Sequence, residues 1–161
     1  MNRKTHFVLA AAALAVAALS TFQLASAASA KPVTTVGGVT FEDVEAQTRQ
    51  FIAWHDSIEL TPAQEAIRFQ ALSTIPAPCC SDNSAATCCC PCNMAKSVWG
   101  LSKYLITEKG AGVEQVRKAA QDWFAFINPG GFSGDVCYTG GCGKAFHENG
   151  CGGMRADRPV F

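Results

Sequence analysis

The chain has 161 residues, with 13 basic residues, 13 acidic residues and nine cysteines. Its length suits a single domain. It contains no run of basic residues, which excludes nucleic acid and an anionic membrane surface from the expected partners.

Residues 1–30 carry the features of a secretory signal peptide in the usual order. Arg3 and Lys4 form a positively charged start, an alanine-rich apolar run spans 7–19, and small-x-small sites end at Ala27 and Ala30. We expect cleavage after 27 or 30 and a periplasmic or secreted mature protein. The apolar run is shorter than the roughly 20 residues of a membrane span, so we expect no stable membrane anchor. Without the signal, eleven basic residues face thirteen acidic ones, a net charge of −2 with histidine neutral.

The mature chain begins with an expected flexible lead at 31–39, followed by one cysteine-rich domain at 40–161. The first predicted helix runs from 41 to about 56, with Thr40 as its cap, because its apolar residues recur at helical spacing. A second helix is predicted from Thr61, where a hydroxyl cap, Pro62 and Gln64 form a strong start signal, to about residue 73. Residues 76–91 are expected to form an irregular loop.

Two further helices are predicted after this loop. Cys92 opens the third, which Gly110 ends, and the fourth spans 113–127. The short connection between them predicts an antiparallel helical hairpin. The glycine-rich tail at 132–161 has no helical or strand period. The expected fold class is therefore mainly α, with about four helices, an irregular cysteine-rich loop, an irregular Gly/Cys-rich C-terminal tail and no strands.

The cysteines are the most informative residues, because they cluster in the second half of the chain. They lie at positions 79, 80, 88, 89, 90, 92, 137, 142 and 151. The tail spaces its cysteines around His147 in the pattern Cys137-x4-Cys142-x4-His147-x3-Cys151, which offers the thiols and imidazole of a tetrahedral zinc site. The adjacent thiols of the loop favour a softer ion such as Cu(I). The candidate metal ligands are Cys79, Cys80, Cys89, Cys90, Cys92, Cys137, Cys142, His147 and Cys151.

Two alternatives use the same residues. In an oxidising compartment the cysteines can form a network of disulfide bonds that stabilises a non-catalytic module. Because the number of cysteines is odd, at least one thiol then remains unpaired within the chain. Cys89 and Cys92 also form a C-x-P-C pair at the start of a helix. Helix-terminal N–H groups lower the pKa of a cysteine in that position, which suits thiol-disulfide exchange. No other catalytic motif is present.

The segment 66–122 resembles exported bacterial proteins named for a PCYCGC motif. The similarity rests on Leu72-x-x-Ile75-Pro76, on Cys79-Cys80, on Cys89-x-x-Cys92-x-x-Ala95, and on Gly110 followed by Val113-x-x-Val116-Arg117. The cysteine-then-helical-hairpin layout is also similar to the small thiol subunit of cytochrome c maturation. The resemblance implies an exported, cysteine-rich, metal-linked protein.

From these observations we expect an exported protein that binds or traffics a soft metal, most simply copper, with zinc as the second choice. We expect a metal-binding protein and not an enzyme. Its expected partner is a metal-acceptor protein in the same compartment.

Overall fold

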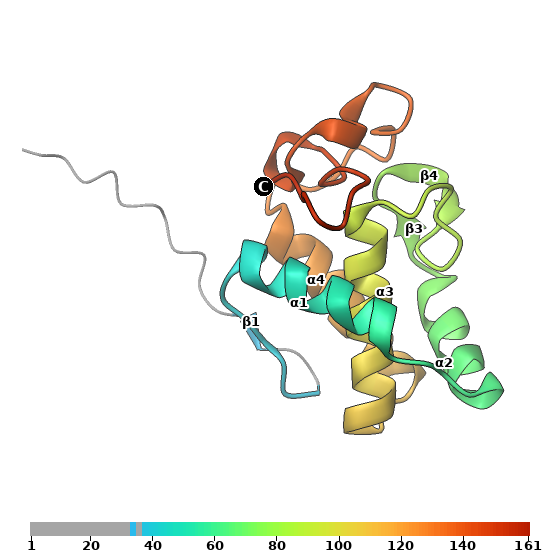
Figure 1. The fold of residues 1–161 in the computed structure, drawn as a ribbon. Helices are drawn as coiled ribbons and strands as arrows, with labels where there is room; N and C mark the ends of the chain where they lie inside the picture. Colours follow the sequence, from blue (N-terminus) through green and yellow to red (C-terminus); the bar gives the residue numbers. More distant parts are fainter. Residues whose placement is uncertain (1–32, 35–36) are drawn as a thin grey trace, which may run out of the picture.

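The computed structural model describes residues 33–34 and 37–161, so the expected signal peptide lies outside the described residues. Four helices form the body: α1 (Val44–Ser57), α2 (Pro62–Leu72), α3 (Asn93–Lys109) and α4 (Val113–Ile127). Figure 1 shows α1 crossing α3, and it shows α3 and α4 running in opposite directions. The mainly helical fold and the helical hairpin are confirmed.

The expected absence of strands is wrong. β1 (Val33–Thr34) pairs antiparallel with β2 (Thr40–Phe41), and β3 (Pro76–Ala77) pairs antiparallel with β4 (Cys80–Ser84). The β3–β4 hairpin lies within the segment that we expected to be an irregular loop. Strands this short carry too few residues for a period of two to be visible in the sequence.

The helix boundaries follow from local capping. α1 begins three residues later than expected, because the Asp43 carboxylate accepts a hydrogen bond from the Ala46 amide at 2.8 Å and Thr40 belongs to β2. α2 begins at the predicted capping box: Thr61 Oγ1 accepts from the Gln64 amide, and Gln64 Oε1 accepts from the Thr61 amide. α3 ends at Gly110, whose φ of 63° is the left-handed conformation of a glycine C-cap.

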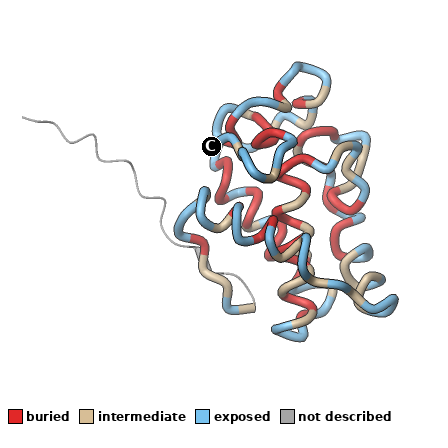
Figure 2. The backbone as a smooth tube through the Cα atoms, viewed as in Figure 1, coloured by how far each residue is buried: buried red, intermediate tan, exposed pale blue. Residues whose placement is uncertain are grey.

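The core is aromatic and lies between the helices. Trp123 is fully buried, and its ring meets Phe51 edge-on with centroids 4.8 Å apart. The indole N–H of Trp123 donates to Ser97 Oγ at 2.9 Å, so its one polar atom is satisfied. α1 and α3 touch backbone to backbone at Gly100, where a Cβ atom would lie 1.7 Å from the Phe51 carbonyl oxygen. Figure 2 shows the buried positions along the facing helices and in parts of the tail.

The C-terminal tail is ordered by docking. It contains two short 3-10 helices, η1 (Gly141–Gly143) and η2 (Phe146–Glu148), and it buries Val136 and Phe146. The antiparallel hairpin places the end of α4 beside the start of α3, so the tail returns to the end of the molecule where Cys92 lies (Figure 1). This arrangement brings the two cysteine-rich segments of the sequence together.

Candidate metal centre

Backbone hydrogen bonds fasten the tail to the cysteine-rich hairpin and to α3. The Cys137 amide donates to the Cys79 carbonyl at 2.9 Å, and the Ser81 amide donates to the Gly134 carbonyl at 2.8 Å. At the start of α3, the Met94 amide donates to the Cys151 carbonyl at 3.2 Å. The first N–H groups of a helix have no partner within the helix, so carbonyls of the tail serve as part of the cap of α3.

Asn93 makes the most specific side-chain contact with the tail. It is fully buried, and its side-chain amide donates to the carbonyls of Gly152 and Arg155 at 2.8 and 2.9 Å. Its backbone amide donates to the Gly153 carbonyl at 2.9 Å. One residue next to Cys92 therefore fixes the tail that carries three cysteines.

Three thiols form an inner triad, which consists of Cys79, Cys88 and Cys92. Their sulfur atoms all lie within 4.8 Å of one another, and the sulfurs of Cys79 and Cys88 are 3.2 Å apart. Cys79 and Cys92 are buried and Cys88 is half-buried. Soft metal ions prefer thiolate ligands, and these three thiols converge on one point, so the inner triad can hold a metal ion.

Cys92 is the N-cap residue of α3, as its position before the helix predicted. Interactions with the thiol of Cys151, then with those of Cys79 and Cys88, hold the pKa of Cys92 far below its ordinary value, and the Ala95 amide adds to this. The contact with Cys88, then the contact with Cys92 and burial, raise the pKa of Cys79 far above its usual range. One thiolate stabilised by neighbouring thiols is the arrangement in which a cation can replace the remaining protons.

A second group of thiols, the outer triad, consists of Cys89, Cys90 and Cys137. These sulfur atoms also lie within 4.8 Å of one another, with Cys137 3.6 Å from Cys89 and 3.9 Å from Cys90. Cys89 is exposed and the other two are half-buried. Burial, with the hydrogen bond to Cys89, raises the pKa of Cys137 to about 11. The outer triad can also hold a metal ion, and it is open to solvent.

The two triads are adjacent. The Cys137 amide donates to the Cys79 carbonyl at 2.9 Å, so a backbone hydrogen bond joins a residue of the outer triad to one of the inner triad. Cys90 and Cys92, which belong to different triads, are also close enough to influence each other electrostatically. The nine cysteines are all free thiols in this structure. The six thiols of the triads therefore form one connected patch with a buried and an exposed side.

The structure brings five of the nine predicted ligands into these triads. The other four lie outside both groups. Cys80 contacts the Tyr138 hydroxyl at 3.4 Å, and Cys151 donates to the Cys142 carbonyl at 3.2 Å while its thiol contacts that of Cys92. His147 is exposed and lines a shallow hollow with Phe126 and Phe161. Of the proposed redox pair, Cys89 belongs to the outer triad and Cys92 to the inner one.

Cys88 belongs to the inner triad but was missing from the predicted ligands. The signal for it was its place in the run Cys88-Cys89-Cys90. Residues 89 and 90 form a bend, so the alternation of an extended strand does not hold there. Cys88 contacts Cys79, whereas Cys89 and Cys90 both contact Cys137. The sequence could not say which of the three would face inward.

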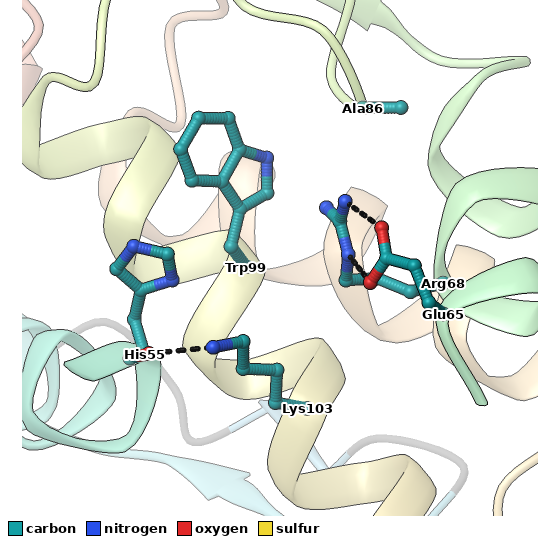
Figure 3. Close-up of a pocket in the computed structure, with 6 residues that line it drawn as sticks. All are labelled: His55, Glu65, Arg68, Ala86, Trp99 and Lys103. Carbon is teal, nitrogen blue, oxygen red and sulfur yellow. Dashed lines mark hydrogen bonds and ion pairs between the residues drawn. The ribbon is translucent and has the colours of Figure 1, made fainter. Parts of the chain in front are cut away.

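A separate polar cavity of about 220 Å³ lies between α1, α2 and α3 (Figure 3). Its charged groups are already paired: Arg68 with Glu65, and the Lys103 ammonium with the His55 carbonyl at 2.6 Å. Burial, followed by the charge of Lys103, lowers the pKa of His55 below 6.5. No thiol lines this cavity, so it is distinct from the candidate metal centre.

Comparison with known protein families, with curated proteins and with solved structures gives no match for this chain. Within the part of the chain that the structure describes, no helix has both the length and the apolar character needed to cross a bilayer. The class that fold and site define is a small helical domain with thiol groups that can hold a metal ion.

Proposed function

We propose that this protein binds Cu(I) through its thiol triads and acts as an exported copper-binding or copper-trafficking protein. The observation that supports the proposal is the presence of two groups of three cysteine sulfur atoms. Within each group, the sulfur atoms all lie within 4.8 Å of one another. Thiolates bind both zinc and Cu(I), but structural zinc sites take four protein ligands in a tetrahedron, and each triad offers three. Three-thiol groups therefore favour copper over zinc.

The expected compartment agrees with this chemistry. The N-terminal pattern and the similarity to PCYCGC-motif proteins both predict export to the periplasm or secretion. Outside the cytoplasm, free thiols are oxidised unless something protects them. A bound metal ion is one such protection, because it holds each sulfur as a coordinated thiolate. A metal-acceptor protein in the same compartment is the partner that trafficking requires.

Thiol-disulfide exchange is a second candidate, and the low pKa of Cys92 favours it. Reactive cysteines must also be reached by their substrate. Cys92 has no exposed surface, and the tail covers the start of its helix. A copper site tolerates such burial better than an exchange reaction with another protein does.

The test is an anaerobic titration with Cu(I) of the mature protein, purified from the compartment to which it is exported. We expect tight uptake of one Cu(I) for each triad, accompanied by the ultraviolet absorption of Cu(I)–thiolate bonds. Protein with Cys79, Cys89 and Cys92 replaced by serine should lose this absorption, while a Thr87→Ala variant, altered on the same loop with all thiols present, should keep it. A native protein that carries no metal and holds eight of its cysteines in disulfides would overturn the proposal. It would instead support the alternative of a non-catalytic module stabilised by disulfide bonds.

A further inference from the structure

We infer that the two triads have different tasks: the outer triad receives Cu(I) from a thiol-bearing or chelating donor in solution, and the inner triad retains it. This inference rests on the proposed function and adds a direction of transfer to it. It follows from the difference in exposure between two groups of the same chemistry.

The first step of the argument is access. Cys89 is exposed, and it forms the outer triad with two half-buried thiols. Two of the three inner thiols are buried, with 1% of the surface of Cys79 and none of Cys92 exposed to solvent. A donor of ordinary size can therefore contact the outer sulfurs but not all of the inner ones. Copper that arrives from solution meets the outer triad first.

The second step is the connection. Cys137 belongs to the outer triad and is joined through its backbone to Cys79 of the inner triad. The 2.9 Å bond from the Cys137 amide to the Cys79 carbonyl keeps these residues adjacent. A copper ion bound by Cys137 thus has an inner ligand within reach before it loses its outer ones.

The transfer is a ligand exchange without a redox step. Copper remains Cu(I) throughout. At each stage one Cu–S bond forms to an inner sulfur and one Cu–S bond to an outer sulfur breaks. The inner thiol that gains the metal releases its proton to solvent, and the outer thiolate that loses it takes up a proton. The ion ends on the more buried ligands, from which an external chelator removes it less readily.

The relay is tested by stopped-flow mixing of the apo-protein, under anaerobic and reducing conditions, with the coloured Cu(I)–bicinchoninate complex. Loss of the complex's colour gives the rate of uptake. In a Cys89→Ser/Cys90→Ser variant we expect uptake to slow by about tenfold or more, because a site on the same chain no longer supplies copper at high effective concentration. The copper finally retained by the inner triad should be held as tightly as in the wild type.

The complementary variant is Cys88→Ser, which removes the half-buried member of the inner triad. Its fast uptake should be preserved, but excess bicinchoninate should withdraw the copper, with an affinity weaker by about 100-fold or more. Thr87→Ala serves as the control for disturbance of the loop, and helical circular dichroism verifies that each variant is folded.

The outcomes separate the two proposals. If the wild type takes no copper from the complex, the proposed function fails. If the wild type binds copper but the Cys89→Ser/Cys90→Ser variant takes it up as fast as the wild type does, copper binding stands and the relay is wrong. Slow uptake by this variant with unchanged retention supports the relay.

Discussion

The helical body and the cysteine-rich end of this protein are held together by different interactions. In the body, Phe51, Trp123 and their neighbours bury large apolar surfaces, and burial of each such side chain contributes about 1.5–3 kcal/mol. At the cysteine-rich end, the tail buries few large side chains and relies on backbone hydrogen bonds and on Asn93. A net intramolecular hydrogen bond contributes only about 0.5–1.5 kcal/mol. From this comparison we expect a bound ion to stabilise the cysteine-rich end more than the helical body.

The largest expected effect comes from the centre of the body. Trp123→Ala should lower the free energy of unfolding by about 3–5 kcal/mol, because it leaves a cavity among aromatic rings and removes the hydrogen bond that Ser97 Oγ accepts. Urea unfolding followed by circular dichroism measures this loss. Phe69→Ala removes a half-exposed aromatic residue from α2 and should change stability by less than about 0.5 kcal/mol. Equal effects of the two substitutions would contradict the assignment of Trp123 to the core.

Copper should increase the local stability of the cysteine-rich end more than that of the helical body. At a free Cu(I) concentration about 100 times the dissociation constant, binding to the folded state alone contributes about 2.7 kcal/mol. In native-state hydrogen exchange we expect the amides of 79–92, and those of the tail around Cys137, to gain the most protection. Amides of α2, which contributes no ligand, are the internal reference. If the added protection were confined to α2, the prediction that copper stabilises the cysteine-rich end would be wrong.

Asn93→Ala should loosen the tail while leaving the helices intact. The substitution deletes two hydrogen bonds to carbonyls of the tail, one of them fully buried, at an expected cost of about 1–3 kcal/mol to its docking. Faster hydrogen exchange at 151–155 with unchanged helical circular dichroism is the expected result. Asn83→Ala is the control, because the Asn83 amide donates to the Cys80 sulfur instead. Global unfolding of the Asn93 variant would show that the tail and the body are one cooperative unit.

The smallest effect concerns His55 in the body. Burial lowers its pKa, so below its ordinary value of 6.5 the unfolded chain binds a proton that the folded chain resists. Stability should therefore fall as the pH drops below 6.5, and this residue should contribute no change above it. The effect is modest because His55 is only half-buried. Urea midpoints at about pH 7.5 and about pH 5.5, compared between wild type and His55→Gln, measure it. An identical pH dependence in the two proteins would refute the contribution of His55.

The sequence predicted the helices well because their signals are local. The capping box at Thr61, the glycine at 110 and the apolar period of α4 each specify their element within a few residues. The same local reasoning placed Cys92 at the start of α3. What it missed was the β3–β4 hairpin, whose strands are too short to show a period.

The division of the thiols into two triads could not be predicted from spacing. It depends on the return of the tail past Cys79, which only the packed helical hairpin brings about. His147 illustrates the limit: it sits among cysteines in the sequence, yet the turns of the tail place it on an exposed surface beside Phe161. Cys88 illustrates the reverse case, because its inward orientation separates it from its neighbour Cys89.

The two triads also differ in how far apart their members lie along the chain. All inner ligands come from the segment 79–92, whereas the outer triad joins Cys89 and Cys90 to Cys137, some 48 residues away. Closing a short loop costs less entropy than closing a long one, so the inner ligands can gather in a chain that has not finished folding. The outer triad exists only after the hairpin and tail have assembled. Newly made chains would thus acquire their retaining site before their receiving site, and an intact outer triad would mark the chains whose folding is complete.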